Sequence, residues 1–217
     1  MREINIKALL CTGLLFLGVS FSTTAQHNSI MVGGGLSTML GDADLNIIDW
    51  DSYGYSITAR YIHPFKKNDR WNYTLEYSTA SMTQRGFIAT DLYKPKISQT
   101  YVGVGCRFYI FNTIREYNPY FMELLPFIQA SAGVLSHSVY FAEPYANSSD
   151  FGISEGEYQG ATLQFTGGIL IVLDKHWGLE GYAGFRYDPV DEWDGLKGNT
   201  SLGDVFSHGG IGLNYAF

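Results

Sequence analysis

Two pairs of neighbouring residues have the types that a hydrolase uses as nucleophile and base: His137-Ser138 and Ser207-His208. Hydrolysis needs the two side chains hydrogen-bonded to each other, with a third group orienting the base. Each pair lies in a segment where apolar and polar residues alternate, and adjacent residues of a strand point to opposite faces. Neither pair can therefore act as a dyad on its own, and no G-x-S-x-G elbow is present. We expect the protein not to be an enzyme.

Acidic residues gather in two stretches, residues 40–51 and 188–205, which raises the question of a metal site. Calcium takes roughly six to eight oxygen ligands. Neither stretch matches the pattern D-x-[DN]-x-[DN]-G with a closing Glu. We expect no metal and no cofactor, and interpret both stretches as solvated loops, with a docking surface for another protein as the alternative.

The composition excludes other classes of function. The chain has 217 residues and a formal net charge of -7, which argues against nucleic acid as a partner. At the amino terminus Arg2 and Lys7 precede a short apolar run, and Thr23-Thr24-Ala25 offers small residues for cleavage. We therefore predict a secretory signal peptide over residues 1–25, too short to span a membrane as a helix. Cys106 is then the remaining cysteine, interpreted as an inert thiol.

The carboxy-terminal residues 208–217 predict a strand with one apolar face. Apolar residues alternate with small or polar ones, and the chain closes on Tyr215 and Phe217. A terminal aromatic residue at the end of such a strand is typical of outer-membrane barrels, where it serves as the insertion signal for the barrel assembly machinery. We predict this role for Tyr215 and Phe217.

The same period of two recurs along the chain and predicts an all-β fold, an eight-stranded antiparallel transmembrane barrel over residues 26–217. An even number of strands suits a closed barrel, and closure matters because an unpaired sheet edge in lipid costs several kcal/mol per backbone group. The strands are expected near residues 29–39, 52–63, 70–81, 98–111, 124–139, 160–173, 177–187 and 206–217.

A soluble up-and-down barrel is the alternative fold, since alternation does not say which face points outward. A water-facing surface would be dense in Lys, Glu and Asp, whereas here the polar positions are mostly Gly, Ser, Thr, Ala and Asn. Aromatic residues also recur toward strand ends, as in the girdles at membrane interfaces. Both features favour the membrane barrel.

The connections alternate in length, which predicts the topology. The segments after the first, third, fifth and seventh strands are long, and those at 64–69 and 174–176 are short. Outer-membrane barrels have short periplasmic turns and longer external loops. We therefore expect a bacterial outer-membrane location with both termini in the periplasm.

The odd and even positions assign charged side chains to the lumen. An eight-stranded barrel has an interior just wide enough for side chains to fill it, and buried charges must be paired. We predict a polar plug rather than a pore, with Arg60 paired to Glu76. The predicted lumen network comprises Arg60, Glu76, Arg107, Glu180 and Arg186.

Three stretches carry a resemblance to a known family: residues 33–42, reading Gly-Gly-Gly-Leu-Ser-Thr-Met-Leu-Gly-Asp, then Leu125-Pro126-Phe127-Ile128, and Phe185-Arg186-Tyr187 before the acidic loop. They resemble small outer-membrane barrels of the bacterial phylum that uses type IX secretion, most of all the PorG-like family, with the PorT-like and OmpA-like families behind it. The stretch from Tyr187 to Asp194 departs from the PorG-like pattern.

The resemblance implies a non-enzymatic accessory that anchors periplasmic subunits of a type IX-like secretion machine, with outer-membrane lipid and lipopolysaccharide around the barrel. The turn at 112–121 is then the first place to look for contact with those subunits. The alternative is a stand-alone structural or adhesive barrel that acts through its external loops.

Overall fold

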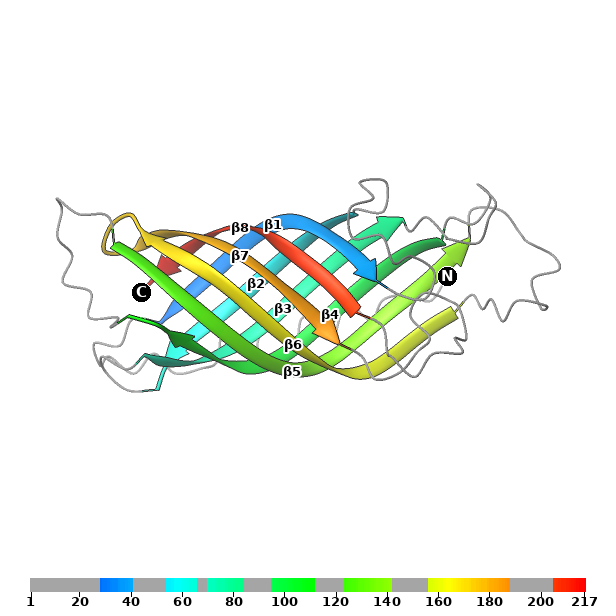
Figure 1. Cartoon of the computed structure of the whole chain (residues 1–217), viewed down its shortest axis with the longest axis horizontal. Helices are drawn as coiled ribbons and strands as arrows, with labels where there is room; N and C mark the ends of the chain where they lie inside the picture. Colours follow the sequence, from blue (N-terminus) through cyan, green and yellow to red (C-terminus); the bar gives the residue numbers. More distant parts are fainter. Residues whose placement is uncertain are drawn as a thin grey trace.

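Eight antiparallel strands close into one barrel (Figure 1) in the computed structural model, which describes residues 28–40, 54–65, 70–83, 95–111, 123–141, 156–187 and 205–217. The strands are β1 (Ser29–Leu40), β2 (Gly54–Pro64), β3 (Trp71–Thr83), β4 (Pro95–Tyr109), β5 (Glu123–Phe141), β6 (Gly156–Val172), β7 (Trp177–Tyr187) and β8 (Val205–Ala216). Each pairs with its neighbours in chain order, and β1 pairs with β8. The predicted all-β fold, a closed eight-stranded antiparallel barrel, is confirmed. The segment predicted as a signal peptide, the long acidic stretches and the segment 112–121 were assigned from sequence alone and lie outside the described residues.

The seam between β1 and β8 closes the sheet along its whole length. Ser29 is opposite Ala216 at one end and Leu40 is opposite Val205 at the other. Glycine is required here, because a β-carbon at Gly33 would lie 2.7 Å from the carbonyl oxygen of Ile211 and 2.9 Å from Cα of Gly212. Strand glycines commonly mark such close backbone approaches.

Alternation gives the barrel two chemically different faces. Large apolar side chains are exposed on the outer face of every strand, among them Val104 at 63%, Ile211 at 62% and Leu163 at 51%. The residues between them point inward and are buried, and many are polar or charged. This is the reverse of a soluble protein, whose large apolar residues gather inside.

The inward side chains form three layers along the barrel axis. An apolar cluster at the end with the short turns includes Leu125, Phe127 and Val172, and a second at the opposite end includes Met82, Ile97 and Val139. The five charged side chains lie among the buried residues of the same inner face, and buried Gln99 and His137 lie beside Ile97 and Val139 of the second cluster. The polar lumen is therefore bounded at both ends by apolar side chains.

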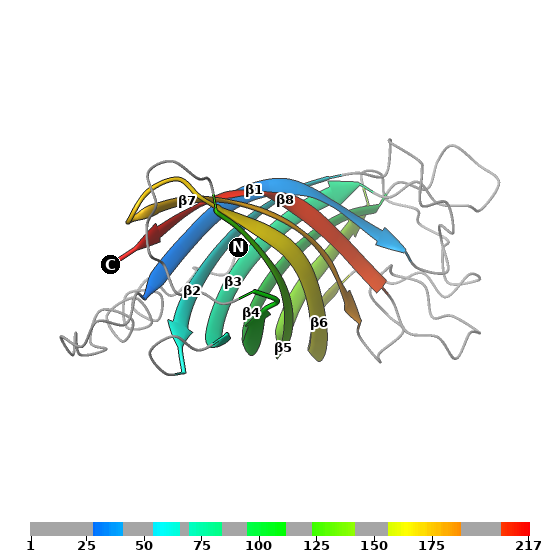
Figure 2. The same cartoon turned by 60° about the vertical axis from the view of Figure 1, so that its left-hand side comes forward.

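The strand ends define two unlike ends of the barrel. One end of the barrel carries the beginning of β1, the end of β8 and the turn from β6 to β7 (Figure 1). At the other end β5 and β6 reach beyond β7, since Tyr187, the last residue of β7, pairs with Leu163 while β6 already begins at Gly156. The strands tilt strongly against the axis (Figure 2), as closure of a small barrel requires.

No helix long and apolar enough to cross a membrane occurs in the part of the chain that the structure describes.

Candidate functional site

The buried charges of the lumen form a single chain of alternating sign. Glu180 accepts from Arg107 Nη1 at 2.7 Å and from Arg60 Nη1 at 2.6 Å. Arg60 Nε donates at 2.9 Å to Glu76, whose other carboxylate oxygen lies 3.6 Å from Arg186 Nη2. The order is therefore Arg107, Glu180, Arg60, Glu76, Arg186, with every member 2% exposed or less. The network members predicted from the sequence are all brought together, and Arg60 pairs with Glu76.

Two buried glutamines link members of the charge network to one another across the barrel. Gln129 accepts from Arg107 Nε at 3.2 Å and donates to Glu76 at 3.0 Å. Gln164 donates to Glu76 at 2.8 Å and accepts from Arg186 Nε at 2.5 Å. Each amide therefore uses its oxygen to accept from an arginine and its nitrogen to donate to Glu76, so that it bridges two groups of opposite charge.

The outer two arginines of the chain lie against the apolar layers. The guanidinium carbon of Arg107 is 3.8 Å from the centre of the Phe127 ring, and that of Arg186 is 4.2 Å from the centre of the Tyr101 ring. A cation over an aromatic face gains about 2 kcal/mol when the pair is desolvated. Arg186 also donates to the hydroxyl of Ser78. The formal charge of the five members is +3 - 2 = +1.

Some buried polar atoms have no hydrogen-bond partner within the described residues. They include Arg60 Nη2, both amide atoms of Asn214 and both ring nitrogens of His208. Ordered water commonly completes such groups in a buried network.

The structure separates the residue pairs that suggested hydrolysis. His137 is buried on the inner face of β5 and stacks on Tyr158 at 5.0 Å, while His208 on β8 stacks on Phe206 at 5.9 Å. Ser138 and Ser207 are half-buried, at the alternate positions of the same strands. Strands β5 and β8 are not neighbours. No group of three or more His, Cys, Asp or Glu residues is positioned to hold a metal in the described ranges; the acidic stretches lie outside them.

The end of β8 is bonded on both sides at the turn end of the barrel. Ala216 N donates to His176 O at 2.6 Å, and Phe217 N donates to Asn28 O at 2.8 Å. The Tyr215 ring is 4.8 Å from the Trp177 ring and 6.3 Å from the Phe217 ring. Tyr215 and Phe217, the residues predicted as an insertion signal, are 40% and 37% exposed on the outer face.

The short turn from β6 to β7 is closed by one carboxylate. Asp174 Oδ1 accepts from the backbone N–H of His176 and of Trp177, both at 2.7 Å. These backbone hydrogen bonds, the one from Trp177 first, lower the pKa of Asp174 below its ordinary value. Asp residues commonly cap turns in this way.

Sequence reasoning placed the charged residues inside but missed what surrounds them. The contacts of Glu180 with Arg60 and Arg107 and the two glutamine bridges join strands far apart in the barrel, which alternation along one strand does not reveal. The apolar layers were also missed, although Phe127, Leu125 and Leu135 occupy the same parity as Gln129 and Ser131. That parity is the signal that could have found them.

Solved outer-membrane barrels share this fold. Neisserial surface protein A superposes with a TM-score of 0.56 at 10% identity, over 88% of this chain and 97% of that one. A major outer membrane protein from Thermus thermophilus gives 0.49 at 12% identity over 89% and 100%, and OprG from Pseudomonas aeruginosa gives 0.47 at 13% over 88% and 97%. No family model and no curated protein matches the sequence. The likeness to Neisserial surface protein A carries the conclusion that the chain has the fold of a small eight-stranded outer-membrane barrel.

Proposed function

We propose that the protein is an integral, non-enzymatic barrel of the bacterial outer membrane that serves as a rigid anchor, with both termini in the periplasm. The observation that carries this is the inverted distribution of side chains: exposed apolar residues outside and a bonded chain of five charges inside. In water such a surface would associate or precipitate. In a bilayer the same apolar side chains contact lipid acyl chains, and closure of the sheet leaves no backbone group of a strand edge unpaired.

The lumen of this anchor is a plug rather than a path for ions. Its support is the geometry of the charge chain, since every carboxylate oxygen of Glu76 and Glu180 lies within 3.0 Å of a donor. Apolar side chains bound the charges on both sides. An ion that entered would have to break contacts that are costly to break in a buried setting.

Reconstitution in planar bilayers tests the plug. We expect no stable conductance steps from protein whose insertion is verified by the shift in gel mobility between unheated and heated samples. Reproducible single-channel steps from folded protein would reject the plug while leaving the barrel in place.

The finer role is that of an accessory which anchors periplasmic subunits of a secretion machine of the type IX kind. Its support is the sequence resemblance of residues 33–42 and 125–128 to PorG-like barrels. Co-purification from mildly solubilised membranes tests it. Recovery of the barrel without any periplasmic partner, under conditions where its folded state persists, counts against this role.

A stand-alone adhesive barrel is the second candidate, favoured by the length of β5 and β6. A spanning strand needs about 9–11 residues, whereas β5 has 19 and β6 has 17, and their excess lies at the end away from the short turns. This hairpin would raise the connection between β5 and β6 above the membrane. Deleting residues 142–155 from that connection and measuring attachment of cells tests the adhesive role.

A further inference from the structure

Strand β6 has an unpaired edge where it extends beyond the end of β7 (Figure 1). Pairing between these two strands starts at Leu163, opposite Tyr187, although β6 begins at Gly156. On its other side the same stretch is paired with β5, up to Gly156 opposite Val139. Residues 156–162 therefore form the outermost strand of a projecting sheet, and in the part of the chain that the structure describes no strand lies along their open side.

The backbone groups that face this open edge belong to every second residue. Leu173 N donates to Trp177 O at 2.9 Å, so the backbone of Leu173 faces β7. The pairing of β6 with β7 runs on from there without interruption, and residues of an antiparallel strand direct their N–H and C=O groups alternately to the two neighbouring strands. Counting back in twos places the N–H and C=O groups of Ala161, Gln159 and Glu157 at the open edge. Such a row of unpaired groups is a template for a further strand.

The sequence shows why β7 itself does not cover this edge. A continuation of β7 in the same register would bring Pro189 opposite Ala161. Proline has no N–H and therefore could not donate to the carbonyl oxygen of Ala161. At the last pair of the ladder, Thr162 Oγ1 donates to Tyr187 O at 2.9 Å, which caps the end of β7. Ala161 and the residues before it are thus left with edge groups that β7 does not pair.

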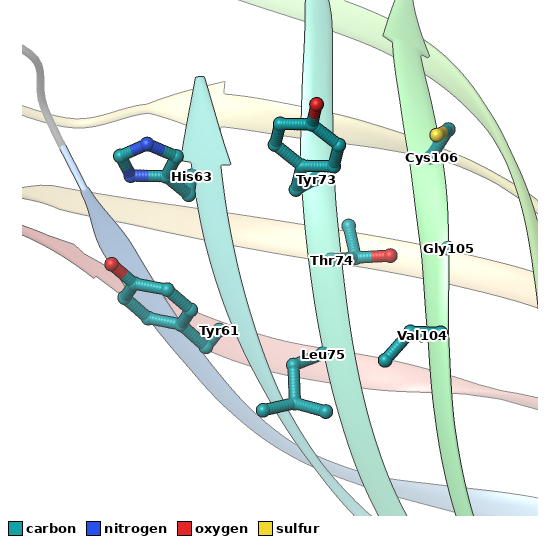
Figure 3. A pocket seen from close by; sticks show the side chains of 8 residues that line it. All are labelled: Tyr61, His63, Tyr73, Thr74, Leu75, Val104, Gly105 and Cys106. Carbon is teal, nitrogen blue, oxygen red and sulfur yellow. The ribbon is translucent and has the colours of Figure 1, made fainter. Parts of the chain in front are cut away.

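The projecting edge differs in chemistry from the barrel wall. Near the short turns the outer face is apolar and aromatic, as between Tyr61, Leu75 and Val104 (Figure 3), which suits lipid. On the open edge the outward side chains of Glu157 and Gln159 are polar and exposed. Unpaired backbone groups are not tolerated in the hydrocarbon of a bilayer. This edge therefore belongs in water above the membrane, which is outside the cell in the proposed topology.

The side chains beside the edge define the strand that fits it. Glu157 is exposed and lies opposite the uncharged Ser138 of β5, so a basic residue on an added strand would complete a cross-strand pair of opposite charge. Tyr158 is half-buried on the inner face and stacks on His137 with 5.0 Å between ring centres. An apolar residue facing Tyr158 would extend that packing. Since side chains alternate along a strand, the matching segment has a basic residue next to an apolar one.

We propose that residues 157–161 bind an extended segment of another protein, which pairs with β6 as an added antiparallel strand and has a basic residue next to an apolar one. In this mode of recognition backbone hydrogen bonds give affinity and alternate side chains give specificity. The inference deepens the second candidate function, the adhesive barrel, and rests on its topology. It assigns the contact to a strand edge rather than to the connection at 142–155.

The test titrates a fluorescent peptide of alternating lysine and valine with the full chain in lipid nanodiscs and follows the anisotropy. A peptide with glutamate in place of lysine is the control for charge. Q159P removes an N–H from the open edge and leaves the hydrogen bonds to β5 in place, whereas Q159A removes the same side chain and keeps that N–H. Hydrogen exchange measures protection of residues 156–162. The folded state of every variant is verified first by heat-dependent gel mobility.

We expect wild type and Q159A to bind the lysine peptide equally, with new protection of residues 156–162. Q159P should bind it roughly tenfold more weakly, equivalent to about 1.4 kcal/mol, and E157K should reverse the preference toward the glutamate peptide. Equal binding by Q159P and Q159A, or no protection of the folded wild type, overturns the edge site. A wild-type dimer that Q159P abolishes would assign the edge to a second copy of this chain and overturn the peptide partner.

Attachment of cells separates the edge site from the adhesive role. Peptide binding that depends on the Gln159 N–H, without any attachment of cells, supports the edge site and counts against the adhesive barrel. Attachment of cells by folded protein that binds no peptide supports the adhesive barrel and overturns the edge site.

Discussion

Replacing Glu180 by Gln removes one charge from the centre of the lumen network and leaves its shape unchanged. Glu180 is 0% exposed and accepts three hydrogen bonds, one from Arg60 and two from Arg107, at 2.6–3.0 Å. The amide of E180Q offers one acceptor oxygen, and its NH₂ group faces guanidinium donors. The formal charge of the network rises from +1 to +3 - 1 = +2.

Removing one partner of a buried ion pair costs about 3–5 kcal/mol, because the other charge stays buried without compensation. We expect the free energy of unfolding of E180Q to fall by that amount. With a urea dependence of about 1–3 kcal/mol per molar, a loss of ~4 kcal/mol lowers the urea midpoint by roughly 1–4 M. The assay is reversible urea unfolding in lipid vesicles, followed by tryptophan fluorescence.

Two further variants make the result specific. E157Q applies the same change to an exposed carboxylate on β6, and we expect a change within about 0.5 kcal/mol. The double variant R107M/E180L keeps the network charge at +2 - 1 = +1, and should be destabilised less than E180Q alone, since apolar groups of similar size often replace a buried pair at little cost. Similar stability of E180Q and E157Q would refute the reasoning.

Three other changes address the seam, the end of the chain and the short turn. G33V should destabilise the barrel by about 1–3 kcal/mol through overpacking, since its β-carbon meets the backbone of β8. The control G181V should fold normally, because nothing lies within 4 Å of its β-carbon. Equal urea midpoints for the two variants would contradict the close-packed seam. F217D should lower the yield of assembled barrel in the membrane fraction, measured by heat-dependent gel mobility, and wild-type levels would remove the insertion role of Phe217. D174A should lower the urea midpoint at neutral pH, because the lowered pKa of Asp174 means that its ionised form stabilises the fold above the ordinary carboxyl pKa. The difference in urea midpoint between D174A and wild type should shrink as the pH falls below about 4. A difference in midpoint that persists in acid would argue against the carboxylate contacts.

Much of the fold follows from the sequence because a strand in a membrane barrel has a period of two with opposite polarity on its two faces. Alternation predicts Ile211, Leu213, Tyr215 and Phe217 outside and Ser56, Thr58 and Arg60 inside, and the structure has them there. Strand β5 continues beyond its predicted last residue and β6 begins before its predicted first residue. The reason is that backbone pairing continues to Pro95–Phe141 between β4 and β5 and to Val139–Gly156 between β5 and β6.

The lumen site could be predicted only in part. Parity identifies which side chains enter the interior, yet the contact of Arg107 with Glu180 depends on how far each strand is shifted against the next around the barrel. That shift is set by pairing across every strand rather than by any one segment.

Collision accessibility of spin labels tests the central claim most directly, that the apolar outer face meets lipid. Cysteine substitutions at Leu163, Phe165, Ile211 and Leu213 place labels on outward positions of β6 and β8 without disturbing the lumen. The exposed native thiol of Cys106 is first replaced by C106S, so that only the introduced cysteine is labelled. In reconstituted vesicles we expect these labels to be accessible to oxygen, which dissolves in lipid, and shielded from a water-soluble nickel complex. Labels that meet the nickel complex as readily as oxygen would contradict the membrane barrel and support the soluble one.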